Sequence, residues 1–353
     1  MQQSKRTTLP GWLVYALGGA FVLAMAAVLL FAWLTYQIII NRELNPLEGP
    51  GQAGPVLTAG GGGPAPVPTM ITGRPTPTTA PTRVPWTGTD RVNILLMGID
   101  RRPGEPFISR TDTMMLLSYD PVGNTASILS IPRDLYVSIP GYGRDRINTA
   151  FVYGALGNDP RSGAELAMQT IQYNLGVPVH HYIMVDFSAV VQGIDALGGI
   201  EVNVPAPIND LQYPDMNYGY DPLYIPAGLQ QFDGEMALKY ARTRHGSSDI
   251  SRAERQQQII LAVRDKALAL GLPQLIAQAP RFYDQLEQGV RTDLSLDELI
   301  KLAWAVGDIP AENIYNEVIG AEMVSSYQTP QGASVLILDN AKVAPLIQRL
   351  FYK

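Results

Sequence analysis

The sequence predicts an α/β domain at the C-terminal end of a membrane-anchored chain. Three observations support this: strand and helix patterns intermix from about residue 91 onward, an uncharged apolar run lies near the N-terminus, and a stretch rich in Pro and Gly separates the two. Of the 353 residues only 16% are charged, compared with roughly 25% in soluble domains. The apolar run and the uncharged stretch account for this low value.

Residues 9–40 are predicted to form one transmembrane signal-anchor helix. Residues 7–41 carry no charge, and about 20 apolar residues suffice to cross a bilayer. Lys5 and Arg6 lie in the short tail before this run, so the positive-inside bias places residues 1–8 in the cytoplasm and the rest of the chain outside. The alternative is a cleavable signal peptide, but cleavage at its small-residue site would leave a strongly apolar new N-terminus.

Residues 41–90 are predicted to be a disordered linker, and residues 91–353 a folded domain. The 50 linker positions include 10 Pro and 9 Gly. Such a composition cannot bury enough apolar surface to offset the entropy of ordering the chain. The segment therefore reads as a spacer between the membrane and the folded domain.

Three strands open the domain. Residues 92–98 are almost all apolar, which is typical of a buried strand. Residues 113–119 and 126–131 are two more strands, and the segment 120–124 between them has the Asp-Pro-Val-Gly-Asn composition of a turn.

Helices and strands alternate in the middle of the domain. Residues 164–175 are amphipathic and are followed by Gly176 and Pro178, which end a helix. The next predicted elements are a strand over 181–185, a helix over 187–196 that ends at Gly198-Gly199, a strand over 200–204 and a long loop over 205–226.

The last third is mostly helical. The predicted elements are helices over 233–241, 252–270, about 273–288 and 295–306, a strand over 334–338 and a final helix over 341–351. Intermixed strands and helices along roughly 260 residues predict a single α/β domain.

Composition excludes several function classes. The pI near 5.2 argues against a general nucleic-acid binder, which needs a basic surface. The absence of cysteine excludes disulfides, cysteine nucleophiles and thiolate metal sites. Of the three histidines only His245 lies near a charged cluster, and a satisfied loop histidine is its simpler interpretation.

The first charged cluster follows the strand 92–98. Asp100 lies at its C-terminal end, and Arg110 and Asp112 directly precede the next strand. Ligands of open α/β sheets bind outside the carboxyl ends of strands, and neighbouring carboxylates repel unless a cation lies between them. A Mg²⁺ ion with phosphate oxygens fits such a pair. The alternative is a surface loop with ordinary ion pairs.

The second cluster, Arg133 and Asp134, follows another apolar strand. Pro132 prevents the strand from continuing as part of a central ladder, so both side chains project from a fixed bend. A structural salt bridge is the alternative interpretation.

The third cluster contains four arginines within 14 residues: Arg242, Arg244, Arg252 and Arg255. On the helix predicted to begin near residue 252, Arg252, Arg255 and Gln256 share one face. Cations in a first turn oppose the helix dipole, so a bound anion would explain their position. Asp249 or Ser251 is a candidate cap for this helix. The alternative is a solvated charged face.

Six segments in this order resemble the LytR–CpsA–Psr family over about residues 91–351. They are Asn93 to Asp100, Ser109 to Thr113, Ser130 to Asp134, Arg146 to Phe151, Asp186-Phe187 with Gly198 to Val202, and Gly228 to Gln256. The resemblance implies that residues 91–353 are the catalytic domain and have the fold of that family, a mixed β-sheet flanked by helices.

The resemblance also implies an activity. Members of the family are membrane-anchored extracytoplasmic phosphotransferases. They move a glycopolymer, such as teichoic acid or capsule, from a polyprenyl-pyrophosphate carrier to a hydroxyl of peptidoglycan or another wall glycan, assisted by Mg²⁺ or Mn²⁺. Two alternatives stay open: a pyrophosphatase that transfers the phosphate to water, and a non-catalytic module that binds the lipid or the wall glycan.

Site residues follow from positions that match the family. Asp100 and Asp112 match its metal-associated acids. The implied catalytic residues are Asp100, Arg110, Asp112, Arg133, Asp134 and Asp249, and the choice of a general base among the acids stays open. The implied pyrophosphate-binding residues are Arg110, Arg133, Arg146, Arg242, Arg244, Arg252, Arg255 and Gln256.

The long loop adds four tyrosines, Tyr213, Tyr218, Tyr220 and Tyr224. Their rings could stack on sugars; packing of the loop on the surface is the alternative.

Overall fold

The computed structural model describes residues 87–101, 105–215, 219–243, 249–271, 273 and 289–352. The predicted tail, anchor and most of the linker lie outside these ranges, as does almost all of the helix expected near 273–288. Among the helices of the described ranges, none is long and apolar enough to cross a membrane.

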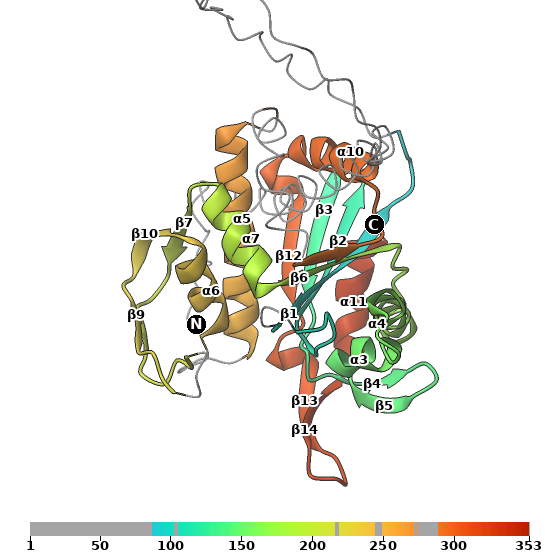
Figure 1. Cartoon of the computed structure of the whole chain (residues 1–353). Coiled ribbons are helices and arrows are strands. Elements are labelled where there is room, and N and C mark those ends of the chain that lie inside the picture. Colours follow the sequence, from blue (N-terminus) through green and yellow to red (C-terminus); the bar gives the residue numbers. More distant parts are fainter. Residues whose placement is uncertain are drawn as a thin grey trace, which may run out of the picture.

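A six-stranded mixed sheet forms the centre of the domain, in the order β11-β6-β1-β2-β3-β12 (Figure 1). β1 pairs antiparallel with β2 and parallel with β6, β3 pairs antiparallel with β2, and β12 pairs parallel with β3. The predicted mixed sheet is therefore confirmed. The strands are β1 Val92–Ile99, β2 Thr111–Asp120, β3 Thr125–Ser130, β6 His181–Asp186, β11 Val290–Thr292 and β12 Ile314–Val318.

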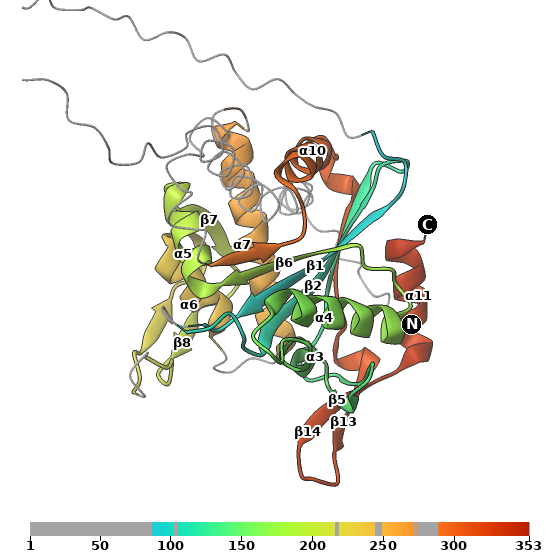
Figure 2. The same cartoon turned by 45° about the vertical axis from the view of Figure 1, so that its right-hand side comes forward.

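Apolar side chains cover both faces of the sheet. In β1, Leu95 and Met97 belong to one core with residues of α4 and α11. Ile94 and Leu96 point the other way, into a second core with α7 and α10, since successive side chains of a strand alternate between faces. Figure 2 shows these helices on the two sides of the sheet. Burial on both faces explains why β1 reads as one continuous apolar run.

Most helices begin at an acidic or hydroxyl cap. Asp159 caps α4 and is followed by Pro160 at the first helical position, so α4 begins four residues before the predicted start. Ser295 and Glu298 form a capping box at α10. The helices are α3 Ala150–Gly154, α4 Pro160–Leu175, α5 Phe187–Ala196, α6 Gly234–Arg242, α7 Asp249–Leu270, α10 Leu296–Gly307 and α11 Asn340–Phe351, with 3-10 turns at Ile147–Thr149, Ala311–Asn313 and Ala321–Met323.

In the described part of the chain, four two-stranded ladders accompany the central sheet. The prediction of a long loop over 205–226 is wrong in part, because this segment contains the ladder of β8 and β9. Each strand has three residues, too few for a recognisable local pattern. The ladders are β4 Tyr136–Ile139 with β5 Gly143–Arg146, β7 Ile200–Val204 with β10 Gly228–Phe232, β8 Ile208–Asp210 with β9 Leu223–Ile225, and β13 Val324–Gln328 with β14 Ser334–Leu338.

Close packing of α5 against α6 generates a prediction. Gly234 begins α6, its N–H donates to Asp195 Oδ1 at 2.7 Å, and a Cβ at Gly234 would lie 2.1 Å from the Val191 carbonyl oxygen. Gly234→Ala should therefore lower the free energy of unfolding by about 1–3 kcal/mol. The measurement is the thermal unfolding midpoint of the full chain in detergent.

Gly193→Ala is the matched control. Gly193 lies within α5, and a Cβ there would meet nothing within 4 Å. This variant should unfold at the wild-type temperature or above it, because Ala favours a helix over Gly by up to about 1 kcal/mol. Equal midpoints for Gly234→Ala and wild type would contradict the close contact.

Candidate functional site

One edge of the sheet gathers the charged residues of the first two clusters. Asp100 follows the C-terminal end of β1, and Arg133 and Asp134 follow the C-terminal end of β3. β2 runs antiparallel to both neighbours, so its second residue, Asp112, lies at the same edge. The pairing thus brings together residues that lie up to 34 positions apart in the chain.

A chain of ion pairs crosses this edge. Arg133 donates through Nη1 to Asp112 Oδ1, and its Nε lies 3.6 Å from Asp134 Oδ2. Asp134 Oδ1 in turn lies 3.2 Å from Arg146 Nε. Alternating charges hold each other in place, and their partial burial strengthens the pairing relative to water. Arg133 is thereby fixed beside the edge before any ligand binds.

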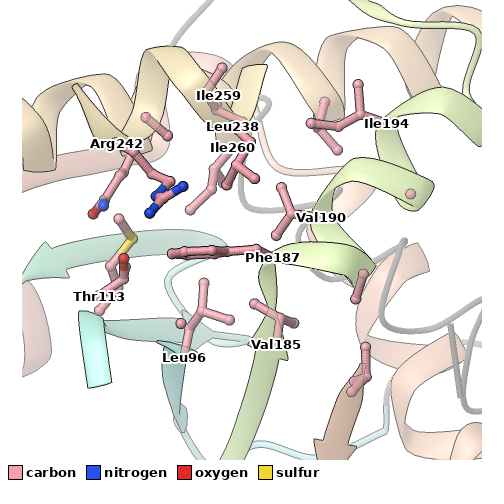
Figure 3. Close-up of a pocket in the computed structure, with 18 residues that line it drawn as sticks. Leu96, Thr113, Val185, Phe187, Val190, Ile194, Leu238, Arg242, Ile259 and Ile260 are labelled. Carbon is pink, nitrogen blue, oxygen red and sulfur yellow. The ribbon is translucent and has the colours of Figure 1, made fainter. Parts of the chain in front are cut away.

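Arg242 is the last residue of α6 and lies over the same edge. Its Nη2 is 3.4 Å from Asp100 Oδ2, and its guanidinium carbon lies 4.5 Å from the centre of the Phe187 ring. Figure 3 shows Phe187 between Arg242 and the strand residues Leu96 and Val185. A cation at a helix C-terminus is favoured by the helix dipole, and the aromatic face orients the planar guanidinium.

The arginines of α7 have two different positions. The helix begins at Asp249, three residues before the predicted start. Arg252, in its first turn, is only 6% exposed and lines two pockets at this edge of the sheet. Arg255 is 8% exposed and donates through Nε to the Tyr240 carbonyl at 3.0 Å and through Nη2 to the Thr243 carbonyl. Arg255 thus binds the C-terminal end of α6 and is not among the lining residues of these pockets.

Arg110 lies toward β5 and α3. Burial alone would raise the pKa of Asp145, but hydrogen bonds from Tyr153, from the Arg146 N–H and from Thr149, together with the charge of Arg110, hold that pKa below its usual range. The Tyr153 hydroxyl donates to Asp145 Oδ2 at 2.5 Å. The exposed Arg110 thus acts through its charge on Asp145, the neighbour in sequence of Arg146 in the ion-pair chain.

Two predicted residues are not placed. Arg244 and the side chain of Asp249 lie outside the described residues. His245 and Tyr218 lie outside them as well.

Three pockets meet at Thr113 and Gln256, which line all of them. An apolar cavity of about 170 Å³ lies between the sheet and α5, α6 and α7. A polar pocket of about 430 Å³ is lined by residues that include Asp100, Asp112, Arg242 and Arg252. A third pocket of about 270 Å³ extends toward β3, β12, β13 and β14. The apolar cavity therefore opens where arginines and carboxylates converge.

Sequence reasoning missed Asp210, gave Phe187 only as part of a family segment, and named Tyr213 only as a candidate for sugar stacking in a long loop. Phe187 begins α5 and lines both the apolar cavity and the polar pocket. Asp210 is buried, lines the polar pocket and accepts a hydrogen bond from Thr243 Oγ1 at 2.6 Å. Tyr213 is buried in the same pocket wall, whereas Tyr220 and Tyr224 are 68% and 66% exposed. Asp210 is the last residue of the three-residue strand β8, which is too short to give a local signal that would single out this acid.

The carboxylates fit a cation shared with a phosphate. Within the described ranges no group of three or more His, Cys, Asp or Glu side chains could hold a metal ion by itself. Asp100, Asp112 and Asp210 nevertheless line one pocket together with arginines. Mg²⁺ is commonly bound by one or two protein carboxylates plus substrate phosphates and water, so this donor set suits a metal that arrives with a phosphate ligand.

Comparisons with known proteins agree with this geometry. The model of the LytR_cpsA_psr family matches residues 71–351. Several relatives are named polyisoprenyl-teichoic acid–peptidoglycan teichoic acid transferases. TagU of Oceanobacillus iheyensis is 39% identical over 60% of this chain and 61% of its own length, and TagT of Bacillus subtilis is 33% identical over 61% and 64%. The matched region thus spans less than two thirds of either relative.

A solved structure extends the likeness to the lipid-bound state of a relative. YwtF (TagT), described as having a bound octaprenyl pyrophosphate lipid, superposes with a TM-score of 0.53 and 26% sequence identity, over 74% of this chain and 90% of the other.

The contacts of Arg255 generate a prediction. Arg255→Met should lower the free energy of unfolding by about 2–3 kcal/mol, because it leaves two main-chain carbonyls near the end of α6 without this donor. The check is the denaturant midpoint of the full chain. Arg161→Met is the matched control: the Arg161 side chain is exposed and pairs with its helical neighbour Glu165 at the surface, so the midpoint of this variant should not change. Equal midpoints for both variants would contradict the assigned role.

Proposed function

The chain belongs to the LytR_cpsA_psr family, and we propose that it is a phosphotransferase that moves a glycopolymer from a polyprenyl-pyrophosphate carrier to a hydroxyl of peptidoglycan. The observation that carries the proposal is the apolar cavity that opens directly into the polar pocket. An amphipathic donor with a hydrocarbon tail and an anionic head requires these two environments in contact.

The apolar cavity suits the tail. Apart from Thr113, Arg242 and Gln256 at its mouth, its lining side chains are apolar, and they come from the sheet and from α5, α6, α7 and β11. Burying a hydrocarbon tail there removes apolar surface from water, which is favourable by roughly 25 cal/mol per Å². The named relative with bound octaprenyl pyrophosphate supports this use of the cavity.

The polar pocket suits the pyrophosphate. Arg242 and Arg252 line it, and Arg133 is held beside it by Asp112. Arginine forks bind phosphate oxygens in a bidentate manner. Catalysis of phosphoryl transfer rests mainly on positioning and on stabilising the developing charge. The guanidinium of Arg242 is oriented in advance by Asp100 and Phe187, and that of Arg133 by Asp112, so these two groups need little reorganisation when the donor binds.

A divalent cation completes the proposal. Asp100 and Asp112 would hold Mg²⁺, or Mn²⁺, together with phosphate oxygens. The bound metal would neutralise charge on the pyrophosphate and favour departure of the lipid phosphate.

The rest of the chain suits a carrier located in the membrane. Residues 9–40 would anchor the protein with its N-terminus in the cytoplasm, and residues 41–90 would hold the domain outside, within reach of the lipid. The wall glycan that accepts the polymer lies in the same compartment.

Transfer can be tested with the full chain in lipid nanodiscs, a polyprenyl-pyrophosphate-linked oligosaccharide, a peptidoglycan oligomer and Mg²⁺. The expected product is a sugar–phosphate–glycan conjugate, identified by mass spectrometry. Arg242→Ala and Asp112→Asn should each lower its rate of formation about 10²-fold or more, because each removes a group that stabilises the transferring phosphate. Arg161→Ala, on the exposed face of α4, is the control and should retain the wild-type rate.

The alternatives give different results. Free sugar phosphate with no conjugate would indicate a pyrophosphatase. Tight donor binding without turnover would indicate a non-catalytic binding module.

The cavity assignment generates a separate prediction. Gly193 lines the apolar cavity, and a side chain at this position meets no atom within 4 Å at its Cβ. Gly193→Phe should therefore occupy space meant for the tail and raise KM about tenfold for a donor with eight isoprene units. A donor with two isoprene units should show a much smaller change in KM. The ratio of the two KM changes is the measurement, and equal changes would contradict the cavity assignment.

A further inference from the structure

The third pocket adjoins the proposed pyrophosphate site, with which it shares Asp112 and Arg252, but most of its lining residues have no role in the function proposed above. It measures about 270 Å³ and lies over β2, β3 and β12, with Ser130 and Arg133 on one side and Val324, Ser326 and Leu336 on the other. The last three belong to the β13–β14 hairpin, which projects from the body of the domain in Figures 1 and 2.

This hairpin is fixed relative to the ion-pair chain. The Leu336 N–H donates to the Asp134 carbonyl at 3.0 Å, and Leu336 forms a parallel bridge with Leu135. Arg146 Nη2 donates to the Ser334 carbonyl at 2.8 Å. The wall of the third pocket therefore stands at a set position beside Arg133.

One face of the hairpin lines the pocket. Ser326 is paired with Leu336 across the ladder, and Val324 lies two residues before Ser326. Side chains two apart on a strand and those directly opposite share a face. Ser325 points to the other face, away from the pocket.

The third pocket and the apolar cavity lie on different sides of β2. The cavity is lined from β1, β2, β6 and β11, whereas the third pocket is lined from β2, β3 and β12. In the sheet these strands are ordered β11-β6-β1-β2-β3-β12. The polar pocket joins the two, sharing Asp112 and Arg252 with the third pocket and Phe187 and Arg242 with the cavity.

We propose that the third pocket binds the acceptor sugar and presents its hydroxyl to the donor phosphate, an inference that rests on the proposed transferase function. In the transfer, the acceptor oxygen bonds to the phosphorus that carries the donor sugar. The bond from this phosphorus to the bridging oxygen of the lipid phosphate breaks, the hydroxyl proton passes to solvent, and the lipid leaves as a monophosphate.

The direction from which the acceptor must attack the phosphorus favours the third pocket as its binding site. In phosphoryl transfer the attacking and leaving oxygens are roughly in line. The leaving lipid phosphate is tied to a tail in the cavity on the β1–β6 side of β2. The acceptor must therefore approach from the β3–β12 side, where the third pocket lies.

The chemistry of the pocket suits a sugar. Its polar groups are hydroxyls and charged side chains of residues such as Ser130, Ser326, Asp112 and Arg133, beside apolar groups of the hairpin. Gln257 Nε2 donates to Ser130 Oγ at 2.8 Å and to the Glu317 carbonyl at 3.0 Å, so the Ser130 hydroxyl is held in place. A few placed polar groups on an apolar wall are typical of small-ligand sites.

The test separates transfer from hydrolysis of the donor by water. Ser326→Trp in the full chain should fill the pocket and lower kcat/KM for the acceptor at least about tenfold. Binding of the polyprenyl-pyrophosphate donor, and its slow hydrolysis to sugar phosphate without acceptor, should stay within about twofold of wild type, because water needs no acceptor pocket. Ser325→Trp on the opposite face of the same strand is the matched control and should retain transfer.

Each other outcome overturns the assignment. Parallel losses of donor binding, hydrolysis and transfer in Ser326→Trp would place the donor glycan in the pocket instead, provided that the unfolding midpoint is unchanged. If the unfolding midpoint of Ser326→Trp falls, the test uses Ser326→Gln, which has a smaller side chain. This variant should show the same selective loss of transfer, with a smaller fold-change. Wild-type rates of transfer in Ser326→Trp and in Ser326→Gln would show that the acceptor binds elsewhere. A wild-type chain that hydrolyses the donor but forms no conjugate would contradict the transferase function itself, and the acceptor assignment would fail with it.

Discussion

The antiparallel pairing of β2 between β1 and β3 is the constraint on which the site depends. A parallel strand would place its N-terminal residues at the far edge of the sheet, about the length of the strand away from Asp100. The antiparallel direction instead puts Asp112 and Thr113 beside the carboxyl ends of β1 and β3. β2 thereby supplies an acid to the polar pocket, and it also lies between the apolar cavity and the third pocket.

The arginines at this edge of the sheet are held in place by specific partner groups. Arg133 is held by two aspartates, Arg242 by Asp100 and the ring of Phe187, and Arg255 by main-chain carbonyls of α6 and its end. Arginines with such contacts lose little conformational freedom when an anion binds. Within the arginine-rich segment 242–255, Arg242 lines the pockets, whereas Arg255 binds main-chain carbonyls at the end of α6.

Local pattern sufficed for much of the fold. α5, β7 and β14 have the predicted bounds, because their apolar periodicity and their flanking Gly or Asp residues are short-range signals. The β8–β9 ladder was missed because three-residue strands carry almost no periodicity, and they form only where Leu223 and Ile225 can bury against a neighbouring core. Asp210 was missed with them, and Tyr213 was expected in a loop rather than in a pocket wall.

The sequence by itself determined the α/β class, the mixture of charged and apolar segments, and the acids and arginines that reach the edge of the sheet. Helical spacing showed that Arg252, Arg255 and Gln256 share a face of α7, but spacing within one helix says nothing about what packs on that face. Only the tertiary structure decided that Arg252 and Gln256 meet the pockets while Arg255 meets the end of α6. The physical reason is that a pocket is the space left between elements, and its position depends on their packing rather than on any one segment.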